Sequence, residues 1–419
     1  MLKIAFRNLF RYHKRTTITA ISICFGVAFG IFIISLLDGV HNESYRNLMV
    51  YETSAIKIFE KGWFEEIEST PIEYLIDSDT ANSLEKQLTE NNITSYTKEF
   101  IENSDVSFYQ DPFPSTGSIQ AQIHALDLSS PSAYEYTKGN IEGQWISPGS
   151  DGVVIGSKLA YDIGADIGYY ITVQTKGKGG FLQAFDVPIV GIIATGNPII
   201  DGGTLFFDYG FIDDILELDG SYSSIAMSFG SSSNSNMKET VKMMPTVTTI
   251  ASNLDLDART WDEIAADIVA LSESDNGGSF FIMFFIFIIA IVGVTNTMVM
   301  AISERKNEVA MLRSLGYTPL YIKTLFCLEG GMIGALGSLL GSIIGVIYSI
   351  YVQINGLDFT SLLGDLDFGY RVSAVFYTDV SAYNVFLVFI FSVLFCTLAA
   401  YLAVHKSINA EIATQLRST

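Results

Sequence analysis

Three features are scarce or missing in this sequence of 419 residues, and each excludes something. The three cysteines, Cys24, Cys327 and Cys396, all fall within long apolar runs, so the polar parts of the chain contain no disulfide. Only four histidines occur, and no spacing around His41 or His124 supplies a zinc site or a nucleophilic triad. The phosphate-loop pattern GxxxxGKS or GxxxxGKT is absent, so the chain shows no such ATP site of its own.

Long apolar runs dominate what remains, in keeping with a mean hydropathy of +0.35. Four runs, at 17–37, 280–302, 325–352 and 383–404, are long enough to be transmembrane helices. They leave residues 38–279 in one block, which is enough for one or two globular domains. The pattern therefore predicts an α-helical membrane protein with four transmembrane helices and a large α+β extracytoplasmic domain between helices 1 and 2.

The charges predict the orientation. Residues 1–16, 303–324 and 405–419 hold eleven basic residues and three acidic ones, whereas the chain as a whole has a net charge of −21. By the positive-inside rule these three segments are cytoplasmic, and the large domain and the loop 353–382 lie outside. The acidic outer domain argues against nucleic acid as a partner. The first run is too long for a usual signal-peptide core and is read as an uncleaved anchor.

The outer domain is expected to alternate helices and strands. Expected elements are a helix at 80–91 capped by Thr80 or Ser83, a strand at 153–155, a short helix at 157–161, a hairpin of strands 169–175 and 184–193 around a turn at 176–180, a polar linker at 231–236, a helix at 237–253 that Pro245 kinks or breaks, and a helix at 261–274. The glycines of the 176–180 turn indicate a hairpin and not a phosphate site. No catalytic constellation emerges, so enzymatic activity is not expected.

The joint between the outer domain and the second span contains Gly277 and Gly278. These two glycines can act as a hinge, because glycine tolerates many backbone angles, and the helix at 261–274 would then be a lever. A plain flexible linker fits the same residues, so both interpretations stay open.

The segment between the second and third spans combines alternating charge with an apolar face. Its charged residues are Glu304, Arg305, Lys306, Glu308 and Arg313, and its face consists of Val309, Leu312, Leu315 and Gly316 at helical spacing. A surface helix of this kind suits a groove on a soluble partner. An amphipathic helix that rests on lipid is the alternative.

The third span carries an ionisable residue and a row of small ones. Gly334, Gly337, Gly341 and Gly345 recur at spacings that allow close helix packing, either within the chain or against a second membrane subunit. Glu329 lies just inside the same span, where a carboxylate must face protein or water. It can also lie near enough to the cytoplasmic surface to be solvated, and no chain of charged groups leads outward from it.

Several of these segments resemble one family. The opening 5–11 (AFRNLFR), the stretch 153–160 (VVIGSKLA) and above all 304–316 (ERKNEVAMLRSLG) are similar to motifs of the FtsX-like permeases, in the branch with a large outer domain that includes lipoprotein-releasing LolC/LolE-like and MacB-like permeases. The tail 408–413 resembles the family's ending, except that Ala410 stands where proline is usual.

This resemblance implies the non-catalytic permease subunit of a type VII ABC transporter in the bacterial inner membrane. The implied partners are a cytoplasmic ATPase that holds ATP and magnesium, a second permease copy or paralogue, and a periplasmic lipoprotein or adaptor; this chain itself would bind no cofactor or metal. Lipoprotein release is the leading expectation. The alternatives are MacB-like efflux, mechanical regulation of a cell-envelope partner, and a membrane-anchored enzyme. The cargo and the homo- or heterodimeric state are not readable from the sequence.

We predict that Glu308→Lys combined with Leu312→Asp weakens binding of the ATPase. The first change inverts a charge and the second puts a carboxylate in the apolar face, so a groove that accepts this helix would reject the variant. The variant should still insert into the membrane, because its spans are untouched. Co-purification of the ATPase measures the effect, and retention equal to the parent chain would contradict the prediction.

Overall fold

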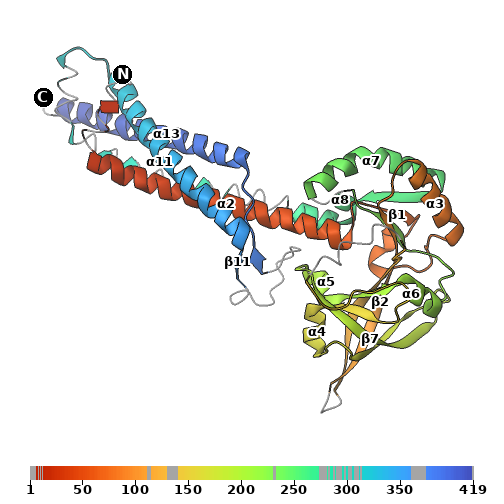
Figure 1. The fold of residues 1–419 in the computed structure, drawn as a ribbon. Helices are drawn as coiled ribbons and strands as arrows, with labels where there is room; N and C mark the ends of the chain where they lie inside the picture. Colours follow the sequence, from red (N-terminus) through yellow and green to blue (C-terminus); the bar gives the residue numbers. More distant parts are fainter. Residues whose placement is uncertain are drawn as a thin grey trace. The chain divides into compact units, whose positions relative to one another are not determined.

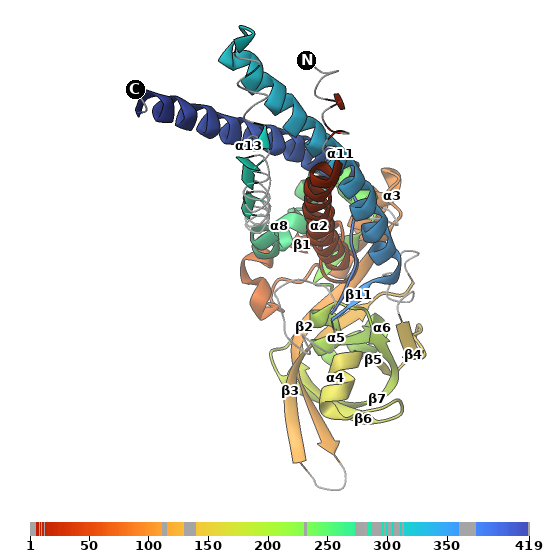
Figure 2. The same cartoon turned by 90° about the vertical axis from the view of Figure 1, so that its left-hand side faces the viewer.

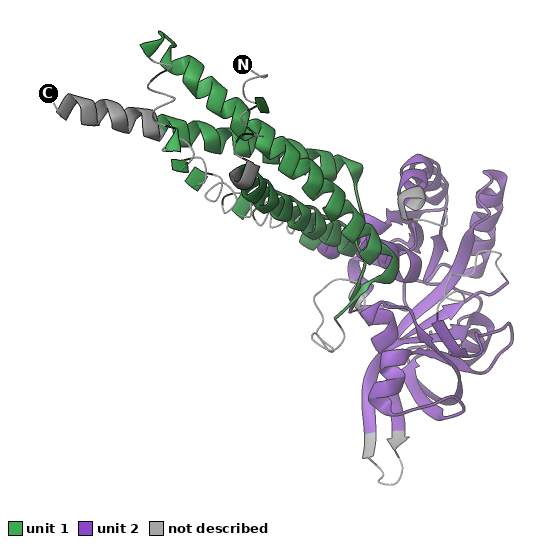
Figure 3. Ribbon diagram, turned by 60° about the vertical axis from the view of Figure 1, so that its left-hand side comes forward, with its two compact units in different colours: residues 1–41, 271–362, 375–419 green, residues 42–270, 363–374 purple. Residues whose placement is uncertain are grey.

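The structure is a computed structural model with two compact units (Figures 1 and 3). It describes residues 6, 7, 9, 11, 13–110, 115–129, 140–229, 233–272, 281, 284, 285, 288, 295, 296, 299, 300, 304, 305, 311, 314–359 and 374–417. Unit 1 comprises 1–41, 271–362 and 375–419, and unit 2 comprises 42–270 and 363–374.

Unit 1 is built on long apolar helices. These are α2 (His13–Asn47), α11 (Pro319–Asn355) and α13 (Ala382–Arg417), with a two-residue pairing of β11 (Leu357–Asp358) and β12 (Val375–Phe376). Within the described residues, three helices are long and apolar enough to cross a membrane: Thr16–Glu52, Pro319–Asn355 and Ala382–His405. They coincide with three of the four expected spans. Most of the remaining one, 280–302, lies outside the described residues.

Local sequence sets both ends of α11. Thr318 is its N-cap, and its hydroxyl accepts a hydrogen bond from the Tyr321 amide at 3.3 Å. Pro319 follows in the first turn, where its missing N–H costs nothing. The helix ends at Gly356, whose φ of +70° is easy for glycine alone.

Unit 2 contains one mixed sheet of ten strands. The strands are β1 (Ile56–Glu60), β2 (Tyr96–Gln110), β3 (Ser115–Leu126), β4 (Asn140–Gly143), β5 (Val153–Gly156), β6 (Tyr170–Lys176), β7 (Leu182–Ala194), β8 (Thr204–Asp208), β9 (Ser224–Met227) and β10 (Leu256–Thr260). The order is β10-β1-β9-β2-β3-β8-β5-β7-β4, and β6 pairs with both β2 and β7. The pairings β2-β3-β8-β5-β7-β6-β2 therefore close into a ring, with β10, β1 and β9 extending from it.

Strand β2 belongs to both parts of this sheet. Its residues 96–99 pair with β9, and its residues 105–107 pair with β6. It also pairs with β3 from Glu99 to Gln110, so the two strands form a long hairpin that extends beyond the rest of the sheet (Figure 2). A single backbone thus connects the two parts of unit 2.

Short helices cover the sheet. They are α3 (Ser78–Glu90), α4 (Ser157–Ile163), α5 (Pro198–Gly203), α6 (Tyr209–Leu216), α7 (Ser233–Asn253) and α8 (Trp261–Ile264), with a π-helical turn η1 (Leu48–Glu52) and a 3-10 helix η2 (Phe64–Ser69). Leu84 and Leu88 of α3 and Val247 of α7 are buried in one cluster with Ile56 and Ile58 of β1. Burial of these aliphatic side chains holds the helices on the sheet.

The expected elements at 153–193 are confirmed with small shifts. They are β5, α4 and the β6–β7 hairpin, whose turn contains residues 177–181. The expected helix at 80–91 is α3, but the proposed caps Thr80 and Ser83 were wrong. Asp77 is the N-cap, because its carboxylate accepts both the Asp79 and Thr80 amides at 3.0 Å.

Two further expectations need correction. Helix α7 begins at Ser233, so part of the expected polar linker at 231–236 is helical, and Pro245 lies within α7 without ending it. The expected helix at 261–274 is not continuous, because α8 ends at Ile264 and the next residue, Ala265, leaves the helical region with a φ of −107° and a ψ of 37°. Residues 266–272 are helical again, and Gly277 and Gly278 lie outside the described residues.

A buried ionic network joins four neighbouring strands of the sheet. The Glu99 carboxylate of β2 is fully buried and contacts the Lys57 ammonium at 2.5 Å and His124 Nε2 at 2.8 Å. It also accepts a hydrogen bond from the Ser224 hydroxyl at 2.5 Å. Burial alone would raise the pKa of Glu99, but Lys57 and His124 outweigh it and hold that pKa well below its usual range. The network therefore fixes β1, the first strand after α2, to β2, β3 and β9.

Glu102 is a second buried carboxyl of β2, with a different environment. Its side chain is 6% exposed, and burial raises its pKa from 4.5 to about 8, aided by Glu73 and opposed by Thr70 and Lys176. Between these two values the unfolded chain binds fewer protons than the folded one. The stability of unit 2 should therefore be highest below pH 4.5, as far as Glu102 is concerned, and fall as the pH rises to about 8.

We predict that Glu102→Gln removes this loss, since the amide stays neutral. The unfolding midpoint of the variant should exceed that of the parent by at least about 2 °C at pH 9 and differ little at pH 5. Thermal unfolding of the full chain between pH 5 and 9 measures this, with the exposed Glu90→Gln as control. A parallel pH dependence of variant and parent would refute the assignment.

Candidate coupling site

A buried ion pair ties the segment between the second and third expected spans to α11. The Arg305 Nη1 atom donates to Glu329 Oε2 at 2.8 Å and lies 3.2 Å from Oε1. Arg305 is 6% exposed and Glu329 is 2% exposed. The guanidinium carbon also lies 5.0 Å from the ring centroid of Phe326, one turn before Glu329 on α11. Charge, hydrogen bonding and a cation–π contact thus act on the same guanidinium group.

Burial decides how such a pair behaves. An isolated charge away from water is costly, and removing one partner of a buried pair typically costs about 3–5 kcal/mol. Arg305 and Glu329 therefore hold each other in place more firmly than an exposed ion pair would. The pair connects the segment before α11, which the charge pattern predicts to be cytoplasmic, with a helix of 37 residues.

The remaining residues of this segment divide into two groups. Among those described, Glu304 is exposed, Leu315 is 69% exposed, and Gly316 has a φ of +87° in the turn before α11. A side chain at Gly316 would meet nothing within 4 Å, so glycine is used there for its backbone angle. The predicted contact residues Lys306, Glu308, Val309, Leu312 and Arg313 lie outside the described residues.

The small residues of α11 bring it close to α2 of the same chain. A Cβ atom added at Gly337, Gly341 or Gly345 would lie 2.8 Å from the Ala20 oxygen, 2.6 Å from the Cys24 oxygen and 3.0 Å from the Ala28 oxygen, respectively. Contacts of 2.8 Å and 2.6 Å are shorter than real Cβ atoms make, so a side chain at Gly337 or Gly341 would push the two helices apart. The spacing of four residues thus places three glycines along one line of backbone contact.

Helix α13 packs on another side of α11. A Cβ added at Gly334 would lie 2.6 Å from Cys396 Cβ of α13. The Ser338 hydroxyl contacts Ser392 Oγ of α13 at 2.8 Å, and both serines are buried. Gly334 thus faces α13 and Gly337 faces α2, although the two glycines belong to one series in the sequence.

The sequence left the partner of Glu329 undetermined. Four basic residues, Arg305, Lys306, Arg313 and Lys323, lie in the adjacent segment, and nothing in their spacing distinguishes Arg305. Lys323 instead contacts His405 Nδ1 of α13 at 3.2 Å. Among the described residues, no group of three or more histidine, cysteine, aspartate or glutamate side chains could hold a metal ion.

The described residues thus combine three helices long and apolar enough to cross a membrane with a mixed α+β domain that follows the first of them. Residues 280–412 match the family model FtsX-like permease C-terminal. The lipoprotein-releasing system transmembrane protein LolC of Neisseria meningitidis is 26% identical over 227 residues, 52% of each protein. The ABC transporter permease YtrF of Bacillus subtilis is 38% identical over 69 residues, 16% of each protein. The crystal structure of the periplasmic region of MacB from Actinobacillus actinomycetemcomitans aligns over 52% of this chain and 92% of that one, at 15% identity and a TM-score of 0.32.

The chain is thus similar to FtsX-like permeases over residues 280–412 and to LolC over about half of its length. It spans about half the length of the curated LolC relative that it matches.

We predict that Gly341→Ala already destabilises unit 1, because its Cβ would lie 2.6 Å from a backbone oxygen of α2. Gly341→Leu should weaken assembly or activity further without blocking insertion, since leucine favours the membrane. Thermal unfolding in detergent gives the comparison. Gly26→Ala on α2 is the matched control, since a Cβ there meets nothing within 4 Å. Equal midpoints for the two alanine variants would show that the close approach is unimportant.

Proposed function

We propose that this chain is the permease subunit of a type VII ABC transporter of the lipoprotein-releasing type, driven by a separate cytoplasmic ATPase. The observation that carries the proposal is the buried Arg305–Glu329 pair, which joins the expected ATPase-docking segment to α11. The relatives named LolC support lipoprotein release. The absence of a phosphate-loop motif agrees with ATP and magnesium being held by the partner, while this chain performs no covalent chemistry.

Force would travel by direct contacts. A push on segment 303–324 moves Arg305, and the ion pair passes the movement to α11. The glycine face of α11 touches the backbone of α2, so a shift of one helix displaces the other. Helix α2 continues to Asn47 and leads through η1 into β1, which the Glu99 network fixes in the sheet.

The partners follow from this arrangement. The ATPase would bind the cytoplasmic face through Glu304, Glu308, Val309, Leu312 and Leu315, and a second permease copy or paralogue would complete the transporter. Both termini would be cytoplasmic, and unit 2 would lie in the periplasm, where it receives a lipoprotein or adaptor. The net charge distribution supports this orientation.

The experiment tests the ion pair as the mechanical joint. We expect Arg305→Gln and Glu329→Gln each to reduce ATP-dependent lipoprotein release more than they reduce ATPase binding, because the dock remains while the joint is broken. The exchanged pair, Arg305→Glu with Glu329→Arg, should recover part of the release. Release from proteoliposomes and co-purification of the ATPase supply the two readouts.

Lys323→Gln is the control, since Lys323 lies at the same end of α11 but contacts His405 of α13. Normal lipoprotein release by both single variants would refute the role of the ion pair in passing movement to α11. A parent transporter that hydrolyses ATP but releases no lipoprotein would instead overturn the assigned cargo.

A further inference from the structure

The chain between α2 and β1 is strained in two places. The turn η1 is π-helical, and the Thr53 amide closes it on the Leu48 carbonyl, five residues back, at 2.9 Å. A π-helical turn contains one residue more than the same turn of an α-helix, is rare, and frequently occurs at functional sites. Ser54 then has a φ of +54° and is only 2% exposed. A residue with a Cβ atom adopts this left-handed conformation at an energetic cost.

Strained backbone persists only where neighbouring groups hold it in place. One such group is Asn197, which lies between β7 and α5 and is fully buried. Its Nδ2 atom donates to Glu52 Oε1, at the last residue of η1, at 2.6 Å. The hydrogen bond fastens the strained turn to the six-stranded ring, to which β1 does not belong.

The Asn197 side chain is itself held in one orientation. Its Oδ1 atom accepts the Ile199 amide at 3.0 Å and the Ile200 amide at 3.4 Å, which caps α5. Its own amide donates to Thr195 Oγ1 at 3.0 Å. An aspartate would cap α5 equally well but has no N–H to offer Glu52. The contact with Glu52 therefore explains why an amide occupies this position.

The residue before Glu52 also meets the ring. Tyr51 packs against a cluster of buried side chains that includes Val154 of β5, Ile200 of α5 and Phe206 of β8. The turn η1 thus contacts the ring through two consecutive residues, in addition to its covalent connection with β1.

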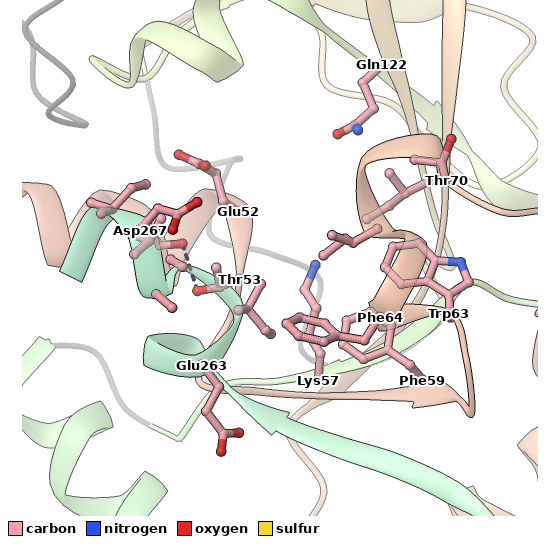
Figure 4. Close-up of a pocket in the computed structure, with 17 residues that line it drawn as sticks. Glu52, Thr53, Lys57, Phe59, Trp63, Phe64, Thr70, Gln122, Glu263 and Asp267 are labelled. Atoms are coloured by element: carbon pink, nitrogen blue, oxygen red, sulfur yellow. Dashed lines mark hydrogen bonds between the residues drawn. The ribbon is translucent and has the colours of Figure 1, made fainter. Parts of the chain in front are cut away.

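Open space lies beside η1. A cavity of about 540 Å³ is bordered there by Leu48, Glu52 and Thr53. Figure 4 shows Glu52 and Thr53 across this cavity from the rings of Phe59 and Trp63. Close-packed interiors resist rearrangement, so a border with open space gives the turn room to change its conformation.

We propose that Glu52 and Asn197 form a latch that holds η1 in its π-helical form. When their hydrogen bond breaks, η1 relaxes toward α-helical geometry, Ser54 leaves the left-handed region, and the end of α2 shifts against the ring. Both are positioning residues, since they act through the backbone of η1. The latch itself is a property of unit 2. Its use in transport rests on the proposed function, in which a closed latch passes a movement of α2 to the ring as well as to β1.

Peptide-resolved hydrogen–deuterium exchange of the full chain in lipid nanodiscs tests the latch, after correction for intrinsic exchange rates. Asn197→Asp keeps the cap of α5 but removes the donor to Glu52. The amides of residues 48–54 should then exchange about twofold to tenfold faster, while those of residues 199–201 keep the parent rate. Asn197→Asp with Glu52→Gln restores a hydrogen bond with donor and acceptor exchanged, and should return most of the protection.

Ser54 supplies a second measurement. Glycine adopts a positive φ freely, so Ser54→Gly added to Asn197→Asp should slow the exchange of residues 48–54 relative to Asn197→Asp alone. The matched control is Glu217→Gly in the same background. Glu217 is exposed and has a φ of +55° at the end of α6, away from η1, so this change should have no effect on residues 48–54.

Four results would each overturn the latch: unprotected amides at 48–54 in the parent, parent-like exchange there in Asn197→Asp, equally fast exchange in the variant with the exchanged donor and acceptor, or equal slowing by Ser54→Gly and Glu217→Gly. Lipoprotein release from proteoliposomes is measured on the same variants. Release that falls in Asn197→Asp and recovers with Glu52→Gln would connect the latch to transport. A parent that releases no lipoprotein would contradict the proposed function, while the exchange rates would still decide the latch.

Discussion

The close approach of α11 to α2 is the constraint on which unit 1 depends. Lipid supplies no hydrophobic drive for two apolar helices to associate, so their contact relies on fit. Gly337, Gly341 and Gly345 provide that fit, because each faces backbone atoms of α2 with no room for a side chain. With the backbones in contact, a shift of α11 displaces α2, and α2 is the helix that continues toward β1.

One buried ion pair lies where the chain enters α11, and another lies in β1, the strand that follows α2. Arg305 and Glu329 join the segment before α11 to the helix itself, and Lys57 and Glu99 join β1 to the sheet. A buried pair adds little net stability compared with an apolar substitute, yet it tolerates few alternative geometries. Such pairs therefore suit points where one element must stay in a fixed position on another, and this explains why both lie where a helix connection meets its neighbour.

Much of the architecture could be predicted from local pattern. Apolar length identified the three helices that the structure describes as possible spans, and alternation with turn residues located β5, α4 and the β6–β7 hairpin. Pattern was less informative for the first half of the outer domain. Strands β1, β2 and β3 were not predicted there, and β2 carries polar residues such as Glu99 and Glu102 at buried positions. A buried charge looks like a surface residue until its partner is known, and Lys57 is 42 positions away.

The sequence by itself determined the long apolar runs, the positions of the glycines, the charged motif at 304–316 and the absence of the phosphate-loop pattern, because each depends on composition or on spacing within one segment. Only the tertiary structure decided which basic residue meets Glu329, which neighbour each glycine faces, and that Glu52, Phe59 and Asp267 surround one cavity. These facts join residues far apart in the chain. Their distances are set by the folding of whole helices and sheets against one another, and no local pattern records that outcome.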